Sequence, residues 1–236
     1  MLACLLLPAA FAQAVDLTLY YNERPPFTSS STNGEVHGLT ADPAVAAVRA
    51  AGLSYQWQER PVNRILALVK ANQEPACAVA LFKTPDRAAF AQFSLPLYRD
   101  HPTVVVTSHD DLGSLGTLAS LLSSRRYRLI VKERFSYGPV IDDMMEREHP
   151  VKTSSPYEVI DLLTAVRKDL ADYTILPREE AEYWLSRDKQ TQGTLRIVSF
   201  PDLPRGEQRF LMCSNKVSPA IMNKLNAAIR QSVQIE

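Results

Sequence analysis

The chain has 236 residues, of which 46% are hydrophobic and 22% are charged. These values are ordinary for a globular protein, and the length allows one large domain or two of roughly 100–120 residues. Lys and Arg together number 26, as do Asp and Glu, so the formal net charge is zero. Because the charge is balanced and no long basic run occurs, we expect no nucleic-acid partner.

The first fourteen residues form an apolar run that ends in Ala12-Gln13-Ala14. An apolar core before an Ala-x-Ala cleavage site is typical of a secretory signal peptide, although no basic residue precedes this core. The run is too short to span a membrane, and a buried first strand or helix is the alternative. We predict a signal peptide over residues 1–14, a mature chain from about Val15, and export to a bacterial periplasm.

Two cysteines follow this segment, Cys77 and Cys213, each inside an apolar, strand-like run. An oxidising compartment permits a disulfide between them, whereas buried free thiols are common at small apolar positions. We favour free thiols. The four histidines are scattered without ligand spacing and no Cys-x-x-Cys motif occurs, so we expect no metal and no cofactor.

The first half of the chain alternates strands and helices. We expect strands at 16–21, 54–58 and 76–82, separated by helices at 42–52 and 62–70. A proline-rich turn at 24–27 ends the first strand. The order strand, helix, strand, helix, strand predicts a parallel α/β unit.

A second unit begins after Asp100 with a β-rich run at 103–106. We expect helices at 115–122, 139–148, 157–166 and 178–185, and strands at 127–131, 151–153, 173–176 and 195–200. A last strand at 210–213 and an amphipathic helix at 219–233 end the chain. Breaks near Asp100 and near 203–206 predict two α/β lobes, with residues 15–99 and 208–236 in the first and residues 100–207 in the second.

The segment Thr84-Pro85-Asp86-Arg87 has the features of a helix start. Thr84 is a suitable N-cap and Pro85 suits the first helical position, where no backbone donor is needed. Arg87 is unfavourable beside the unpaired N–H groups of the first turn unless an anion binds there. The segment is therefore either half of a carboxylate or anion site, or a surface turn whose arginine points into solvent.

Several motifs, in order, resemble the periplasmic extracellular solute-binding proteins of family 3, the polar amino-acid-binding type. They are Pro25-Pro26-Phe27 after the first strand, Gly38-Leu39-Thr40-Ala41-Asp42 before the first helix, Thr84-Pro85-Asp86-Arg87 after the third strand, Phe93-Ser94-Leu95-Pro96-Leu97-Tyr98 at the exit from lobe one, and Ala171-Asp172-Tyr173 before a lobe-two strand. The resemblance covers residues 15 to 229. It implies the two-lobe type II fold of periplasmic binding proteins, with a hinge between the lobes.

The resemblance also implies roles for individual residues. Thr84 and Arg87 match the pair that holds the α-carboxylate of the ligand, and Phe27 would cover its apolar part. The loop before a lobe-two helix would contribute Ser136, Tyr137 and Gly138, whose hydroxyl and backbone N–H groups suit an anion. Ser136 and Gly138 have a plain alternative, as an N-cap and a turn residue.

The sequence also departs from the family pattern. Pro177 stands where amino-acid binders have an acidic residue for the ligand's ammonium group. For Glu179 and Glu180, just after it, we favour an ordinary role at a helix start. Arg64 and Lys83 add positive charge near the motif, either as further anion contacts or as solvated surface side chains. This excess of cations makes a zwitterionic amino acid a doubtful ligand.

Three functions compete. The first is a monomeric binding protein that closes on a small carboxylate-bearing or anionic ligand and passes it to an ABC transporter permease or a membrane sensor. The second is a dehydratase of cyclic carboxylic acids resembling cyclohexadienyl dehydratase, which needs a cleft carboxyl group; Glu23 and Glu179 are the candidates. The third is a sensory module that binds no ligand.

Overall fold

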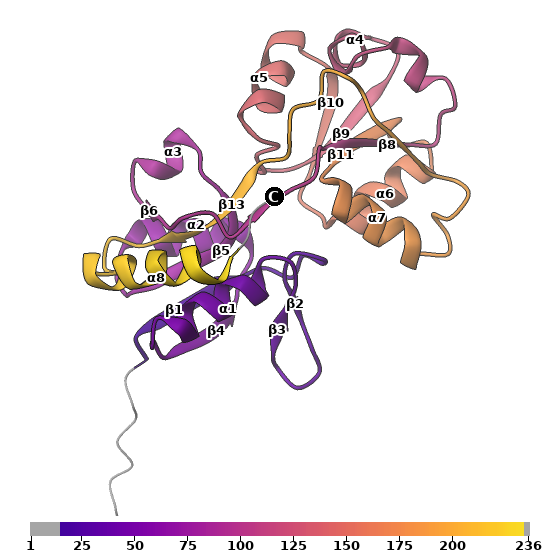
Figure 1. Ribbon diagram of the computed structural model, residues 1–236. Helices are drawn as coiled ribbons and strands as arrows, with labels where there is room; N and C mark the ends of the chain where they lie inside the picture. The colour runs from indigo at the N-terminus through magenta and orange to yellow at the C-terminus, as the bar shows by residue number, and fades with distance from the viewer. Residues whose placement is uncertain (1–14, 234–236) are drawn as a thin grey trace, which may run out of the picture.

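The structure is a computed structural model that describes residues 15–233, so the predicted signal peptide lies outside the described residues. It has two α/β lobes, each built on its own sheet, joined by two chain segments that run side by side (Figure 1). The predicted two-lobe α/β fold is confirmed.

The first sheet has the strand order β4-β1-β5-β13-β6. Its strands are β1 (Leu17–Tyr21), β4 (Tyr55–Glu59), β5 (Ala76–Phe82), β6 (Gln92–Phe93) and β13 (Gln208–Cys213), and β7 (Tyr98–Arg99) also pairs with β13. Strands β1, β4 and β5 are parallel, whereas β13 returns from the second lobe and pairs antiparallel with β5. The returning strand therefore completes the sheet that the first 80 or so residues begin.

Alternating side chains of these strands face two layers of helices. Leu17 and Leu19 pack with α1 (Ala41–Ala50) and α8 (Pro219–Ser232), whereas Tyr20 faces α2 (Val62–Ala71) on the opposite side. In Figure 1, the yellow α8 lies beside the indigo α1, although the two helices come from opposite ends of the chain. Because successive side chains of a strand point to opposite faces of the sheet, both faces are buried under helices.

The second sheet has the order β10-β9-β11-β8-β12. Its strands are β8 (Val104–Thr107), β9 (Arg128–Lys132), β10 (Val151–Ser155), β11 (Tyr173–Leu176) and β12 (Arg196–Val198). Helices α4 (Leu118–Ser123) and α5 (Pro139–Glu148) cover one face, and α6 (Val159–Arg167) and α7 (Arg178–Arg187) cover the other. Each lobe therefore has a core on both sides of its sheet.

Several short elements were not expected. They are β2 (Ser29–Ser30), β3 (Val36–His37), β6 and β7, and the helix predicted at 115–122 is divided into a 3-10 turn, η1 (Leu112–Leu115), and α4. Gly116 separates these two pieces with a φ of 78°. This left-handed conformation, which glycine adopts without steric cost, ends the first turn before the second helix begins.

The two segments that join the lobes touch each other closely. The amide of Asp100 donates to the carbonyl oxygen of Glu207 at 2.9 Å, and Arg99 donates to Gly206 at 3.3 Å. A Cβ at position 206 would lie 1.7 Å from the carbonyl oxygen of Asp100. Glycine is therefore required at 206, since backbone occupies the space that any side chain would need.

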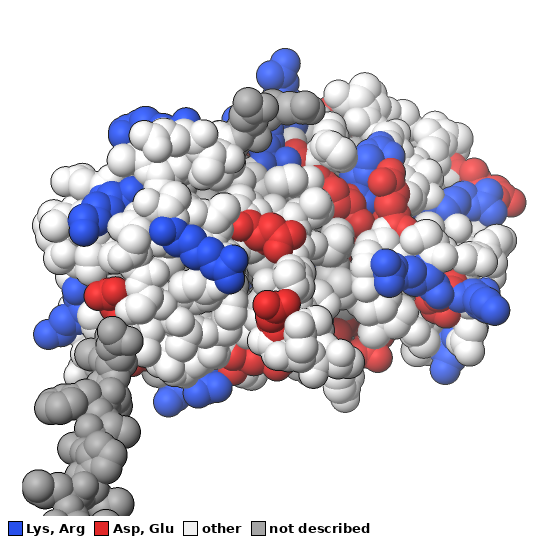
Figure 2. All heavy atoms as spheres, turned by 60° about the horizontal axis from the view of Figure 1, so that its bottom comes forward, with Lys and Arg blue, Asp and Glu red and all other residues white. Residues whose placement is uncertain are grey.

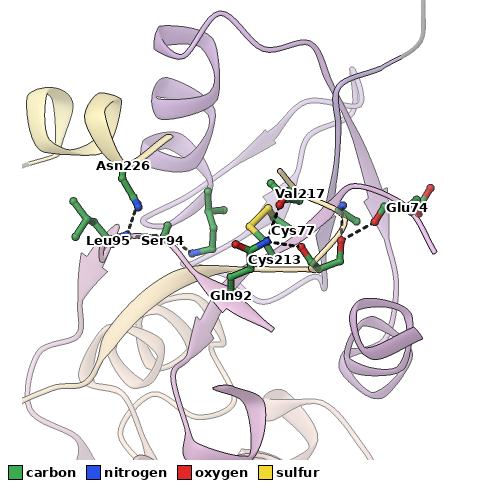
Figure 3. Close-up of a disulfide and its surroundings, with 11 residues drawn as sticks. Glu74, Cys77, Gln92, Ser94, Leu95, Cys213, Val217 and Asn226 are labelled. Atoms are coloured by element: carbon green, nitrogen blue, oxygen red, sulfur yellow. Dashed lines mark hydrogen bonds between the residues drawn. A yellow bond between two sulfur atoms is a disulfide. The ribbon is translucent and has the colours of Figure 1, made fainter. Parts of the chain in front are cut away.

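Cys77 and Cys213 form a disulfide, so the preference for free thiols was wrong. The two residues face each other in the antiparallel pair of β5 and β13, and both are fully buried (Figure 3). The preference failed because it treated each apolar run alone, whereas the topology places the runs on adjacent strands. Nearby, Gln92 donates to the carbonyl of Val217 at 2.7 Å, and Asn226 of α8 accepts from the amide of Leu95 at 2.7 Å.

Charged side chains of both signs are scattered over the face shown in Figure 2. No extended field of one sign is visible on that face, in agreement with the balanced composition. Among residues 15–233, no helix is both long and apolar enough to cross a membrane.

The disulfide predicts a sensitivity to reductant. Because the bond closes a loop across 136 residues of sequence, reduction should lower the free energy of unfolding by about 2–4 kcal/mol. We expect urea unfolding of residues 15–236 to shift to lower urea concentration with dithiothreitol, and C77A/C213A to be insensitive to it. Equal curves for the wild type with and without dithiothreitol, under conditions in which both thiols become titratable, would contradict this prediction.

A second stability prediction concerns Asp172, at the start of β11. Burial alone raises the pKa of its carboxyl group, but hydrogen bonds from Arg128, with a smaller contribution from His109, outweigh burial and lower this pKa. A folded-state pKa below that of the unfolded chain stabilises the fold above the unfolded value, and this contribution is lost as the pH falls through the folded value.

We therefore expect Asp172→Asn to lower the free energy of unfolding by about 1–2 kcal/mol at pH 7, a value kept small because Arg128 is half exposed. The difference from wild type should shrink as the pH falls below the ordinary aspartate pKa and through the lowered folded-state pKa of Asp172, where its carboxyl group becomes protonated. Urea unfolding across this pH range measures both quantities, and exposed Asp143→Asn is the control. A pH-independent difference would contradict the account.

Candidate functional site

A cavity of about 480 Å³ lies between the two lobes. Lobe one lines it with Leu66, Ala67, Lys70, Thr84, Asp86, Arg87 and Phe90, and lobe two lines it with Arg134, Phe135, Ser136 and Asp142. Three of these side chains are cationic and two are anionic. The volume and the mixture of apolar and charged lining suit a small polar ligand.

The lobe-one wall is built by the short helix α3 (Pro85–Ala88), which follows the buried strand β5. Thr84 caps it, and its hydroxyl oxygen accepts from the amide of Arg87 at 3.4 Å. The Thr84 hydroxyl hydrogen remains free to donate to a ligand, since a hydroxyl both donates and accepts. The cap thus fixes Thr84 and Arg87 beside the cavity.

Arg87 is half-buried, and its Nη1 donates to the carbonyl oxygen of Phe82 at 3.0 Å. Burial lowers the pKa of its guanidinium, an effect that Asp142 opposes and Arg209 reinforces. Within residues 15–233, no carboxylate lies within 4 Å of Arg87. An arginine has five N–H donors, so this side chain retains donors for an anion in the cavity.

The lobe-two wall is the loop between β9 and α5. Asp142, in the first turn of α5, accepts from the Ser136 hydroxyl at 2.6 Å and from the Tyr137 amide at 2.8 Å. The Gly138 amide donates to the Ser136 hydroxyl oxygen at 3.2 Å. The Asp142 carboxylate thus receives two of the donors that the sequence assigned to an anionic ligand, the Ser136 hydroxyl and the Tyr137 amide.

Of the eight residues proposed from the sequence, the cavity brings together Thr84, Arg87 and Ser136. Arg64 is exposed on α2 and lines none of the described cavities, and exposed Lys83 lies with its Nζ 5.8 Å from the centre of the Phe93 ring. Phe27 is fully buried and lines none of them either.

Tyr137 and Gly138 support the loop rather than line the large cavity. The Tyr137 hydroxyl accepts from the amide of Lys132 at 2.7 Å, and burial raises the pKa of this phenol. Gly138 precedes α5 with a φ of 93°, and a Cβ there would lie 2.6 Å from the Glu207 side chain. Position 138 therefore favours glycine for backbone conformation and for space.

A continuous set of contacts between cations and aromatic rings crosses the lobe interface; we call it the cation–aromatic series. Its guanidinium or ammonium groups lie 3.8–5.4 Å from the ring centres. In order, its members are Arg209, Phe27, Arg24, Phe135 and Lys132. Such pairs are attractive because the face of an aromatic ring carries negative charge. Of these residues, the sequence had singled out only Phe27.

Each cation of the series has a carboxylate partner. Arg209 donates to both oxygens of Asp100 at 2.6 Å, and both side chains are almost fully buried. Lys132 pairs with Glu158. Arg24 donates from Nε and Nη2 to the two oxygens of Glu180 at 2.9 and 2.7 Å. This last pair joins the lobes.

Glu179 and Glu180 have the helix-start position that we favoured for them, but their side chains make contacts beyond the helix. Both lie in the first turn of α7, but both are buried and neither side chain caps the helix. Glu179 accepts from the Tyr98 hydroxyl at 2.7 Å and from the His101 amide at 2.6 Å. Acidic residues are common in the first turn of a helix whether or not they pair with other parts of the chain. Only the tertiary structure therefore reveals the contacts of Glu179 and Glu180.

Within the described residues, no group of three or more His, Cys, Asp or Glu side chains could hold a metal ion. In the described part of the chain, Arg24, Lys132 and Arg209 are paired with carboxylates whereas Arg87 is not, and this arrangement suits a polar ligand held by hydrogen bonds and ionic contacts.

The buried Asp100–Arg209 pair predicts a large stability effect. Asp100→Asn leaves the Arg209 guanidinium buried and unpaired, so the free energy of unfolding should fall by about 3–5 kcal/mol. The exposed pair of Arg178 and Glu182 is the control. Glu182→Gln should change the free energy of unfolding by less than about 0.5 kcal/mol. Similar urea unfolding curves for the two variants would contradict the assignment.

The chain matches the family model of the bacterial extracellular solute-binding proteins, family 3, over residues 17–234. It is similar in structure to an ancestral arginine-binding protein bound to arginine, with 14% identity, 92% of each chain covered and a TM-score of 0.71. It is also similar to the periplasmic VFT2 domain of BvgS from Bordetella pertussis, with 21% identity, 91% of this chain and 87% of that chain covered, and a TM-score of 0.70.

A third similar structure is the ancestral amino acid-binding protein AncCDT-1, a precursor of cyclohexadienyl dehydratase, with 14% identity, 92% and 88% of the two chains covered, and a TM-score of 0.69. At these identities the likeness concerns the fold alone. No curated protein matches the chain. Because the family model spans nearly all of the described residues, the protein belongs to the bacterial extracellular solute-binding proteins, family 3.

Proposed function

We propose that this family 3 protein binds a small carboxylate-bearing or anionic solute between its lobes, in the periplasm, for delivery to a transporter or detection by a membrane sensor. Closure of the lobes buries the solute, and the higher affinity of the closed state drives the change. The observation that carries the proposal is Arg87: a half-buried guanidinium on a cavity of about 480 Å³, with no carboxylate of the described chain paired to it.

The ligand's carboxylate would take the remaining donors of Arg87 and the free hydroxyl hydrogen of Thr84. A charge-assisted pair of this kind is stronger than neutral hydrogen bonds and is directional. The apolar part of the ligand would lie against Leu66, Phe90 and Phe135, which line the same cavity. Arginine, bound by one structural neighbour, also carries a carboxylate, which is consistent with a carboxylate subsite here.

On lobe two, Ser136 and Asp142 face the same cavity. The carboxylate of Asp142 has acceptor capacity beyond its bonds to Ser136 and Tyr137, because each oxygen has two lone pairs. A hydroxyl or another donor of the ligand would therefore bind at this wall. The ligand would join the lobes through a carboxylate at one end and a donor at the other.

A periplasmic location is supported by the Cys77–Cys213 disulfide, since such bonds persist in oxidising compartments. It is also supported by the family, whose members are extracellular solute-binding proteins. The apolar segment at residues 1–14 is the predicted export signal.

The test is a thermal-shift screen of organic acids, amino acids and amines, followed by isothermal titration of each hit. We expect at least one carboxylate to raise the melting temperature. Arg87→Ala should weaken its binding roughly 30-fold, because a charge-assisted hydrogen bond contributes about 2 kcal/mol. Arg49→Ala is the matched control, since Arg49 is exposed on α1 and lines none of the described cavities.

Two outcomes would contradict the proposal. The first is that no carboxylate binds, and the second is that carboxylates bind Arg87→Ala as tightly as wild type. Assays with prephenate and arogenate are included because an enzyme on this scaffold is the competing function. If the purified protein converted either compound, the protein would be an enzyme and the proposal of binding without catalysis would be wrong.

A further inference from the structure

The guanidinium of Arg24 lies in a binding site formed by other residues of the chain. Arg24 follows β1 in lobe one, and its partner Glu180 belongs to α7 of lobe two. The two parallel hydrogen bonds, of 2.9 and 2.7 Å, form the fork in which a carboxylate best receives a guanidinium. The Glu180 side chain is 1% exposed and the Arg24 side chain 15%.

Two aromatic rings complete this site. The central carbon of the Arg24 guanidinium lies 4.9 Å from the ring centre of Phe135 and 5.4 Å from that of Phe27. A carboxylate with two nearby rings has the chemistry of a site for a planar organic cation. Here the protein's own side chain fills the site.

Arg24 also separates Glu180 from the open space of the interface. Arg24 lines two small cavities, each of about 20 Å³, together with Phe82, Phe135 and Ser136. Glu180 lines none of the four described cavities. A cationic group that entered the interface would therefore meet another cation before it reached this buried carboxylate.

We propose that Arg24 is a specificity-determining residue: its guanidinium is an internal counter-cation that joins the lobes and denies Glu180 to the cationic group of a ligand. The inference rests on the proposed ligand-binding role of the interface, and it names the ligands that the interface excludes. Solutes whose affinity depends on a buried guanidinium or ammonium group are disfavoured, because they must displace a tethered cation that is already paired.

The proposal predicts that removing Arg24 exposes a site for free guanidinium compounds. Arg24→Ala leaves a buried carboxylate without its counter-ion, which is strongly unfavourable until another cation takes its place. We expect this variant to melt at a lower temperature than wild type. Low-millimolar methylguanidinium should then raise its melting temperature by about 5 °C, because a ligand that binds only the folded state stabilises it.

The controls test whether stabilisation by methylguanidinium depends on the Glu180 carboxylate. Wild type should show no stabilisation by methylguanidinium, since Arg24 fills the site, and sodium chloride at the same ionic strength should not rescue Arg24→Ala. The double variant R24A/E180Q keeps the space but lacks the charge, so methylguanidinium should not stabilise it. If Arg24→Ala accumulates unfolded, the yield of folded protein on refolding with and without methylguanidinium provides the same comparison.

The proposal would be overturned if methylguanidinium did not stabilise Arg24→Ala, or if it stabilised R24A/E180Q to the same extent. Stabilisation of wild type to the same extent would overturn it as well. The measurement uses an organic cation as its probe and leaves Arg87 intact. Its failure is therefore distinguishable from failure of the proposed carboxylate site, which the Arg87→Ala titration tests.

Discussion

The buried guanidinium of Arg209 is the constraint on which the relation between the lobes depends. Arg209 lies on β13, the strand that returns from lobe two, and it is 1% exposed. A charge taken out of water to this extent needs partners for its donors. Asp100, at the start of the outgoing segment, supplies two of them, and the carbonyl oxygen of Ala80 on β5 supplies another at 2.9 Å. Both joining segments are thereby fixed to the centre of the first sheet, and the Phe27 ring, 3.8 Å from the guanidinium, fixes the loop that carries Arg24.

From this centre the cation–aromatic series continues into lobe two through Arg24, Phe135 and Lys132. Because each cation has its own carboxylate, the series adds little net charge to the interface. Arg87 differs, since it lies beside the cavity with no such partner among the described residues. The proposed function depends on this difference. The paired Arg24 joins the lobes, whereas Arg87 on the cavity is available to a solute.

Much of the fold was predictable from local patterns. The strands at 76–82 and 173–176 are continuous apolar runs, and the structure has them at the same residues because a sheet covered by helices on both faces buries every side chain of its central strands. Family motifs in the right order gave the two-lobe arrangement. The short strands β6 and β7 were missed, since two-residue strands have no periodicity to detect. The disulfide was missed because its two cysteines are 136 residues apart, and only the pairing of β5 with β13 brings them together.

The site was less predictable. Thr84 and Arg87, which line the cavity, were singled out because a cation in the first turn of a helix is unfavourable; α3 is a single turn, so Arg87 also lies in its last turn. The Arg24–Glu180 pair spans 156 residues, and neither member is unusual in its own segment. Long-range ion pairs of this kind follow from the packing of the lobes, which local sequence does not encode. Asp142 is a different case, because its carboxylate accepts from Ser136 and Tyr137, only six and five residues away, and the sequence reasoning overlooked these local contacts.

The most direct test of the account is a ¹H–¹⁵N spectrum of the arginine Nε–H groups. The signals of Arg24, Arg87 and Arg209 are assigned by single substitutions. The spectrum is recorded with and without a carboxylate ligand from the screen. Nε–H groups donated to buried carboxylates exchange slowly with water, whereas exposed ones exchange fast. The account predicts slowly exchanging, ligand-insensitive signals for Arg24 and Arg209, and a signal for Arg87 that shifts and slows only when the carboxylate is added. A ligand-induced shift at Arg24 with none at Arg87, or exchange of Arg24 as fast as that of exposed Arg64, would contradict it.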